Sequence, residues 1–482
     1  MVDKDFVLWG TGKLSVKYSH LLRQLGMHII NYCDNNSAKW NILHEGVEVI
    51  SPKSLEELSD INLLIACADI FGVKKDISVL CLSGVEVYTI DTFYKSFLVD
   101  SKSAIGNNIF DNKQKWSIVI DNFQGTLGGA EDWAHIVGDK LYERGHEVVV
   151  LELKNTWVTD ALSGKIVKTF SDEPDFLKKH NFLVDYLINI KPFVLINIWN
   201  MDLLVAAAVV RRMYPGQVKI VSSVLNDTAN NYELASTWHY EIDSFVGISS
   251  LIADKLKNIK GLPEEKVLYR LPFIVARRKR KREREYSSVT EPLRICYPCR
   301  LEIAQKRADL IPHIMEMLNT AEVQYELNIV GKGKYEAELK KYVSNNSLHD
   351  KVNFLGWLPK DDLISFFYTQ DVYLNTSEYE GTSLTMLEAM ASGCVPVVTA
   401  VSGVADFIQV DNNGIICTVN DVEVIGKNLI NLARDRSLLS KYGISSMEKV
   451  FSKCILDDYI DFMEQLIVDL VLQGDEYGCV NV

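Results

Sequence analysis

Residues 377–398 read SEYEGTSLTMLEAMASGCVPVV, and this stretch predicts a loop, a short helix and a buried strand in succession. Residues 381–383, Gly-Thr-Ser, favour a loop and supply a helix cap. From Leu384 to Ser392 the apolar residues recur at helical spacing, and Gly393 ends the pattern. The run Cys394–Val398 is apolar, as the buried strands of parallel sheets are.

Two carboxylates, Glu380 and Glu388, stand in this stretch with seven residues between them. Glu388 shares the helix face of Leu384 and Leu387, which is expected to be buried, and a buried charge needs a partner. Glu380 precedes the helix N-terminus, whose N–H groups are suited to hold an anion. A ligand's hydroxyl groups would be one partner for Glu388. Alternatively, Glu380 complements the helix dipole and Glu388 lies at the rim.

Length and composition indicate a globular protein of about three domains. The 482 residues are 48% apolar and 24% charged, which is ordinary for such proteins. The net charge of −13 argues against nucleic-acid binding. No run approaches the ~18 apolar residues of a membrane span, and the N-terminus lacks a signal-peptide pattern. Nine scattered cysteines predict reduced thiols, so we expect a cytoplasmic protein.

The order of strand and helix patterns predicts an α/β fold with Rossmann-like units. Strand patterns at 6–9, at 117–121 and within LRICYPCR, residues 293–300, each lead into a loop and a helix. The expected division is an N-terminal unit at 1–112, a first lobe at 113–275, a basic linker at 276–290, a second lobe at 291–455 and a terminal amphipathic helix at 456–482. Sequential α/β lobes leave a cleft between them, where ligands usually bind.

The N-terminal unit carries a weak form of the dinucleotide-binding fingerprint. Gly10 and Gly12 follow a strand and precede a helix, and Ser15 stands where a third glycine is usual. Asp34 ends the next strand, where an acid would contact a ribose hydroxyl. This is a candidate second nucleotide site, but any tight strand-to-helix turn also favours glycine.

Residues 116 to about 470 resemble the retaining nucleotide-sugar glycosyltransferases of family four, which have the GT-B fold. Five pieces in the right order carry this likeness: GGAEDWAHIVGDKLYERGHEVVVLEL, RLEIAQKRADLI, IVGKGKYEAELKKY, VNFLGWLP and EGTSLTMLEAMASGCVPVV. The last piece contains the family's pair of glutamates.

The resemblance assigns roles to the residues of the opening stretch. The position of Glu388 holds the ribose hydroxyls of the donor, and an ionised carboxylate is a suitable acceptor for both. The position of Glu380 lies by the donor sugar. Backbone N–H groups around Gly381, Thr382 and Ser383 reach the sugar and the diphosphate.

Further donor contacts follow from the same resemblance. Arg300 and Lys306 match the family's basic pair on the diphosphate, where they would stabilise the leaving group without a metal; solvated surface charges are the alternative. Gly128 and Gly129 match the first glycine loop, unless they only start a helix. Trp357 matches the loop beside the nucleobase, unless it belongs to the core.

Three departures from the family pattern are visible. Arg300 and Lys306 are six positions apart where five is commoner, and Gln305 takes the nearer position. Asn226 and Asp227 stand where many members have a histidine, and they are candidate sugar or acceptor contacts. Asp406 is the nearest acid in the segment where the family has a glutamate after proline.

Two other motifs each allow two interpretations. Cys296 and Cys299 form a Cys-x-x-Cys pair without a second pair, which favours two reduced cysteines over a metal or redox site. The stretch RRKRKRER, Arg277 to Arg284, is either a solvated linker or a patch for an anionic membrane. No metal ligand pattern occurs among the nine histidines.

The first ~110 residues, through WGTGKLS and YCDNNSAKW, loosely resemble the N-terminal domain of sugar acyltransferases.

These observations predict a retaining, metal-independent glycosyltransferase. It would move a sugar from a nucleoside diphosphate, most simply UDP, to a saccharide or lipid-linked saccharide, with no cofactor besides the sugar nucleotide. Two alternatives stay open: a catalytically silent GT-B accessory subunit, and a nucleotide-sugar-binding scaffold built around the N-terminal unit.

Overall fold

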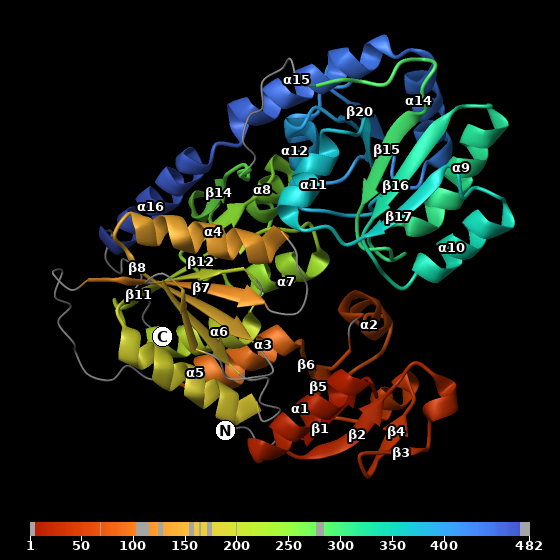
Figure 1. Cartoon of the computed structure of the whole chain (residues 1–482). Helices are drawn as coiled ribbons and strands as arrows, with labels where there is room; N and C mark the ends of the chain where they lie inside the picture. The colour runs from red at the N-terminus through yellow and green to blue at the C-terminus, as the bar shows by residue number, and fades with distance from the viewer. Residues whose placement is uncertain are drawn as a thin grey trace.

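Three mainly parallel sheets follow one another along the chain, each flanked by helices (Figure 1). The computed structural model describes residues 5–67, 69–102, 115–123, 129–153, 159–162, 165–170, 176–198, 200–275 and 284–472. The predicted α/β class, with two Rossmann-like lobes and an additional N-terminal unit, is confirmed.

The N-terminal unit is built on a six-stranded sheet of order β3-β4-β2-β1-β5-β6. Its strands are parallel except for the short β3–β4 hairpin. The elements are β1 (Asp5–Trp9), α1 (Lys13–Gln24), β2 (Ile29–Cys33), β3 (Leu43–His44), β4 (Val47–Ile50), β5 (Ile61–Ile65), α2 (Ile70–Ile77), β6 (Glu86–Tyr88) and α3 (Ile90–Tyr94), which continues as a π-helical turn, η3 (Lys95–Val99).

The middle lobe has an eight-stranded sheet of order β14-β13-β12-β11-β7-β8-β10-β9. Only β9 runs antiparallel to its neighbour. The elements are β7 (Ser117–Phe123), α4 (Gly129–Glu143), β8 (Glu147–Leu153), β9 (Thr159–Leu162), β10 (Lys165–Phe170), α5 (Phe176–Ile190), β11 (Phe193–Asn197), α6 (Met201–Met213), β12 (Val218–Val224), α7 (Ala229–Trp238), β13 (Ser244–Gly247), α8 (Ser250–Lys257) and β14 (Val267–Tyr269).

The C-terminal lobe has a six-stranded parallel sheet of order β17-β16-β15-β18-β19-β20. The elements are β15 (Leu293–Pro298), α9 (Ile311–Thr320), β16 (Tyr325–Val330), α10 (Glu336–Asn345), β17 (Val352–Gly356), α11 (Lys360–Phe367), β18 (Val372–Asn375), α12 (Leu384–Ala391), β19 (Val395–Thr399), α13 (Val404–Phe407), β20 (Ile415–Cys417), α14 (Val422–Arg434) and α15 (Ser437–Lys453).

The last described helix, α16 (Leu456–Leu472), returns to the middle lobe and lies beside α4 (Figure 1). Its Tyr459 ring meets Trp133 edge-on at 6.1 Å between ring centroids. Glu464 accepts hydrogen bonds from Arg144 at 2.9 Å and from His146 at 2.6 Å. The helix predicted at the C-terminus is therefore present, and the chain crosses between the two lobes twice, which ties them together.

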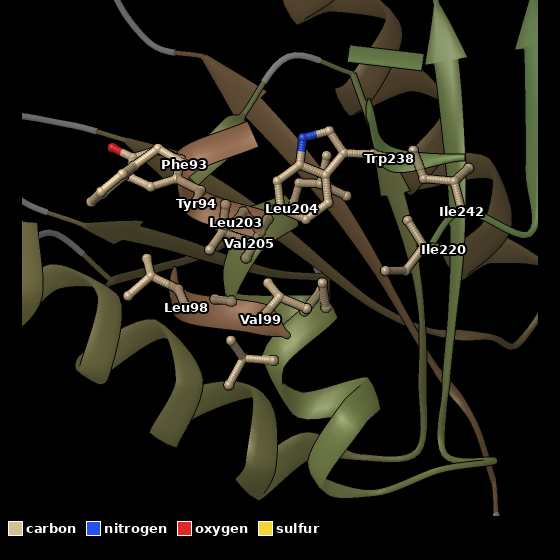
Figure 2. Packing of buried hydrophobic residues seen from close by; sticks show 14 of the residues in the cluster. Phe93, Tyr94, Leu98, Val99, Leu203, Leu204, Val205, Ile220, Trp238 and Ile242 are labelled. Atoms are coloured by element: carbon tan, nitrogen blue, oxygen red, sulfur yellow. The ribbon is translucent and has the colours of Figure 1, made fainter. Parts of the chain in front are cut away.

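The N-terminal unit shares one hydrophobic core with the middle lobe. Residues of α3 and η3 pack against α6 and α7, as Figure 2 shows for Phe93, Tyr94, Leu203 and Trp238. The Tyr94 ring stacks on Phe176 at 4.9 Å between centroids. Each buried aromatic side chain of this kind contributes about 1.5–3 kcal/mol. The unit is therefore fixed to the lobe by apolar packing and is not a loosely tethered module.

Candidate active site

A pocket of about 550 Å³ lies between the middle and C-terminal lobes. This volume is within the range of pockets that hold small ligands. The middle lobe contributes the beginning of α4 and the ends of β12 and β13, and the C-terminal lobe contributes the other residues that line the pocket. The lining includes Gly129, Trp133, Leu225, Asn226, Ile248, Cys299, Arg300, Gln305, Lys306, Trp357, Leu363, Glu380, Gly381, Thr382, Ser383, Leu384 and Thr385.

The two lobes touch directly at the loop before α12. Gly381 forms an isolated antiparallel bridge with Asn226. A Cβ at Gly381 would lie 1.9 Å from the Leu225 carbonyl oxygen, so only glycine permits this approach. Thr382 Oγ1 donates to the Ile248 carbonyl at 3.2 Å. The backbone of the predicted donor loop is thus positioned by the opposite lobe.

Helix α12 directs its N-terminus into the pocket. Ser383 caps it, since its hydroxyl accepts from the Met386 N–H at 3.3 Å. Thr382, Ser383 and Thr385 of this first turn line the pocket. The free N–H groups and the helix dipole make this end a binding place for an anion such as a phosphate.

The predicted basic pair meets the predicted carboxylate beside this helix end. Lys306 forms an ion pair with Glu380, which also accepts from Ser377 Oγ at 2.8 Å. Arg300 donates to the Gln305 side chain at 3.1 Å. The one-residue offset of Lys306 therefore does not keep it out of the pocket, and Gln305 lines the same wall.

Glu388 lies on α12 one helical turn beyond Leu384 and is 7% exposed. Glu388 is not one of the residues that line the described pocket. Its Oε1 is 3.4 Å from the Lys360 ammonium. Burial raises the pKa of the Glu388 carboxyl, while Lys360 opposes this rise. Lys360 also contacts Asp132 of α4 at 3.0 Å. Sequence reasoning missed Lys360, because no motif marks it and only the fold brings it beside Glu388.

The two residues at the family's histidine position have different surroundings. Asn226 lines the pocket, and its buried Oδ1 has no hydrogen-bond partner in the described part of the chain. Asp227 is held by Lys255 at 2.8 Å and by the Tyr232 hydroxyl at 2.6 Å. The structure therefore leaves Asn226 available to a ligand and gives Asp227 a structural ion pair.

The remaining predicted pocket residues lie at its edges. Gly129 begins α4 and approaches Leu384, which a Cβ at Gly129 would meet at 2.9 Å. Trp357 follows β17 and is 47% exposed at the pocket wall. Gly128 lies outside the described residues.

The candidate nucleotide turn of the N-terminal unit is satisfied by its own neighbours. Asp34 accepts hydrogen bonds from Thr11, from the Lys39 ammonium at 2.9 Å and from the Asn36 N–H at 2.9 Å. Burial raises the pKa of Asp34, but these hydrogen bonds outweigh it and the pKa lies below its ordinary value. Gly10 and Gly12 form the expected turn before α1. The structure thus shows an internal role for Asp34.

Asp406 joins the lobes at a position that the sequence reading left without a role. Its carboxylate accepts from the Ser250 N–H at 3.0 Å and from the Ser250 hydroxyl at 2.6 Å, at the start of α8. The neighbouring hydroxyls of Ser249 and Ser402 lie 2.6 Å apart. An acid at the N-terminus of a helix in the other lobe stabilises the interface through the helix dipole.

The Cys-x-x-Cys pair lies beside the pocket and in the core. Cys296 is buried in β15, where its thiol donates to the Val372 carbonyl at 3.3 Å. Burial raises the pKa of the Cys299 thiol to about 12, so the neutral form dominates. Within the described ranges, no group of three metal-ligating side chains occurs.

Most of the basic stretch, Arg277–Glu283, lies outside the described residues. Arg284 is described, and its guanidinium donates to the Phe367 and Gly393 carbonyls at 3.3 and 3.4 Å. This arginine therefore anchors the linker to the C-terminal lobe. Among the helices that the structure describes, none has the length and apolarity needed to cross a membrane.

Comparison with known proteins agrees with this geometry. Residues 278–448 match the family model of glycosyl transferases group 1. The N-acetyl-alpha-D-glucosaminyl L-malate synthase of Bacillus anthracis is 31% identical over 157 residues, which are 33% of this chain and 40% of that protein. The chain spans between 35% and 52% of the lengths of the first three curated relatives that it matches.

Solved structures show the fold. HepE of Anabaena, in complex with UDP and glucose, aligns with a TM-score of 0.59 at 15% identity and covers 74% of this chain and all of that one. A TarM mutant of S. aureus, in complex with Fondaparinux, alpha-GlcNAc-glycerol and UDP, aligns with a TM-score of 0.51 at 11% identity and covers 98% of this chain and all of that one. The two lobes thus have the GT-B fold, and residues 278–448 are similar to glycosyl transferases group 1.

Proposed function

We propose that this protein is a retaining glycosyltransferase that moves a sugar from a nucleoside-diphosphate sugar to a saccharide or lipid-linked saccharide in glycan biosynthesis. One observation carries the proposal. The N-terminus of α12, Arg300, Lys306 and Glu380 meet in one pocket between two lobes. A diphosphate needs positive groups, and a sugar needs hydrogen-bond acceptors; this wall offers both.

The diphosphate would lie against the first turn of α12, with Arg300 and Lys306 as its cations. These groups stabilise the charge that develops on the leaving nucleoside diphosphate, which is an electrostatic form of catalysis. Lys306 is paired with Glu380. The incoming phosphates would compete for Lys306 and free Glu380 for the sugar hydroxyls. This arrangement requires no divalent metal.

We favour UDP as the nucleotide. Among the described lining residues, Glu380 supplies the only carboxylate, and Lys306 engages it. A guanine base presents adjacent N–H donors at N1 and N2 that suit an acidic acceptor, whereas uracil presents a single N–H donor at N3 that a neutral carbonyl can satisfy. HepE and TarM were solved in complex with UDP, while a relative from Corynebacterium glutamicum is described as GDP-mannose-dependent.

Transfer with retention would proceed on one face of the sugar. The acceptor hydroxyl approaches the anomeric carbon from the side on which the diphosphate leaves, and the leaving phosphate oxygen takes its proton. No dedicated protein base is then needed. Asn226 lies in the pocket where many relatives have a histidine, and its unpaired Oδ1 can accept a hydrogen bond from a sugar hydroxyl.

We further propose that the acceptor side of the protein contacts an anionic membrane surface. The basic residues of 277–282 would provide it, since Arg284 is engaged by the C-terminal lobe. Each basic residue near an anionic bilayer contributes about 1 kcal/mol. Sedimentation with anionic vesicles at low salt tests this: binding should disappear when residues 277–282 are replaced by serine, and equal sedimentation of both proteins would refute it.

A screen of nucleotide sugars tests the proposed function. The purified chain should be stabilised against heat by one nucleoside-diphosphate sugar, and it should hydrolyse that donor slowly without acceptor. Donor binding without hydrolysis or transfer would indicate the silent accessory subunit instead. Absence of stabilisation by any nucleotide sugar would contradict the proposal.

A further inference from the structure

Lys360 stands where the two lobes and the buried carboxylate of α12 meet. Its ammonium is 3.0 Å from Asp132 Oδ2 on α4 of the middle lobe and 3.4 Å from Glu388 Oε1 on α12 of the C-terminal lobe. Lys360 begins α11, which packs directly against α12. α4 begins at Gly129, a lining residue of the pocket. One cation is therefore shared by both lobes beside the proposed donor site.

Glu388 depends on this cation for its charge. The carboxyl is 7% exposed, and an unpaired carboxylate at such a site would take up a proton. The strands β18 and β19 beneath α12 carry no charged residue. Besides burial, Lys360 lowers the pKa of Glu388 and Asp132 raises it.

The contact leaves room for a ligand on the same carboxylate. Lys360 lies 3.4 Å from Oε1, and an ionised carboxylate offers about four lone-pair sites on two oxygens. Ribose hydroxyls can therefore bind Glu388 while Lys360 keeps its contact. The Lys360–Asp132 contact, in contrast, would break if the lobes moved apart.

We propose that Lys360 is a positioning residue that keeps Glu388 ionised to receive the donor ribose and, through Asp132, links this subsite to the closed arrangement of the lobes. The inference rests on the proposed function, in which Glu388 binds the ribose. The two contacts of Lys360 have separate effects. Its contact with Glu388 affects donor affinity, and its contact with Asp132 affects lobe closure.

The test compares Lys360→Met with Lys340→Met in calorimetric titrations with UDP from pH 6 to pH 9. Lys340 is a matched control, because it lies in the same lobe, pairs with Glu336 of its own helix on the surface and also lies over the Phe354 ring, away from the pocket. Without Lys360 the pKa of Glu388 rises, so the ionised form that accepts the ribose hydroxyls is present only at higher pH. Relative to wild type at the same pH, affinity of Lys360→Met for UDP should be about tenfold lower at pH 7 and recover toward pH 9, while Lys340→Met follows the wild type at every pH.

Asp132→Asn separates the second task. It retains the Lys360–Glu388 contact, so UDP affinity should stay within twofold of wild type. Turnover should fall about two- to fivefold, because a partly exposed ion pair between the lobes is lost. A purely packing role for Lys360 would instead lower UDP affinity by the same factor at every pH, and that result would overturn the proposal.

A readout without ligand distinguishes this proposal from the proposed function. In Lys360→Met the folded-state pKa of Glu388 is raised further above its unfolded value, so stability that is fully present below the unfolded pKa is lost as the pH rises toward the folded pKa. The melting temperature of Lys360→Met should therefore fall relative to wild type as the pH rises, and Lys360→Met/Glu388→Gln should not show this fall. If Glu388→Gln binds UDP as well as wild type, Glu388 does not bind the ribose and that part of the proposed function is wrong. If Glu388→Gln binds UDP weakly but Lys360→Met keeps normal affinity and a normal melting temperature at all pH values, the proposed role of Lys360 is wrong.

Discussion

Two turns of this chain follow a parallel strand and precede a helix, and they differ in what stands opposite them. The loop at residues 380–383 is covered by the middle lobe, through Asn226 and Ile248. The turn at residues 10–12 is open at Gly12, where a Cβ would meet nothing within 4 Å. Both turns have an acid and a lysine beside them: Glu380 with Lys306, and Asp34 with Lys39.

The difference teaches what converts a glycine turn into a site. Glu380 and Lys306 line a pocket closed by a second lobe, so a ligand can replace their contact. Asp34 already accepts three hydrogen bonds from its own unit, from a threonine, a lysine and a backbone N–H. A turn motif alone therefore predicts local structure, and a facing wall is needed before it predicts binding.

The largest expected effect is on turnover when the pocket lysine is removed. Lys306→Ala should lower kcat by about 10²–10³, the typical cost of losing one group that stabilises developing charge. Lys39→Ala, the matching change in the N-terminal unit, should leave kcat within twofold. Steady-state transfer assays measure both, and a comparable loss in the two variants would erase the contrast between the turns.

The second-largest effect on activity is expected when a methyl group is added to the turn that the middle lobe covers. Gly381→Ala places its Cβ against the Leu225 carbonyl and forces the lobes apart, so kcat/KM should fall about 100-fold, as misplacement of reacting groups by about 1 Å does. Gly12→Ala has free space and should behave like wild type. Normal kinetics of Gly381→Ala with an unchanged melting temperature would argue against lobe contact during the reaction.

The buried acid should affect donor binding. Glu388→Ala removes charge-assisted hydrogen bonds of about 1.5–3 kcal/mol, which raises KM for the sugar nucleotide about 10- to 100-fold. Asp34→Ala should change KM less than twofold, although it should lower the melting temperature because it leaves Thr11 and Lys39 without their partner. An increase in donor KM in Asp34→Ala instead would assign the donor to the N-terminal unit.

The smallest effect is expected from metal removal. Arg300 and Lys306 supply the positive charge at the pocket, so activity in excess EDTA should stay within twofold of the untreated enzyme. Loss of activity in EDTA that manganese restores would contradict the proposed role of the basic pair.

Much of the fold could be predicted from local patterns. The strands at 6–9, 117–121 and 394–398 and the helix from Leu384 were expected within a few residues of β1, β7, β19 and α12. Apolar runs and glycine turns determine such elements through short-range contacts. The glutamate pair also pointed to the correct helix as a wall of the interlobe cleft.

The rest depends on how distant elements pack. The contacts of Lys360 with Asp132, of Asp406 with α8 and of α16 with α4 join residues far apart in sequence. The aromatic core shared by α3, α5 and α7 likewise carries no local signature that would distinguish it from the core of a separate domain. Side-chain spacing within one element contains no information about which lobe will stand across from it.

Calorimetric titration of the full chain with UDP tests the central claim most directly, because it counts the sites and places them. We predict one site per chain, retained with wild-type affinity in Gly12→Ala and Asp34→Ala and weakened about 10- to 100-fold in Glu388→Ala. No binding, two sites per chain, or a single site that Asp34→Ala removes and Glu388→Ala leaves intact would contradict the assignment of the interlobe pocket as the donor site.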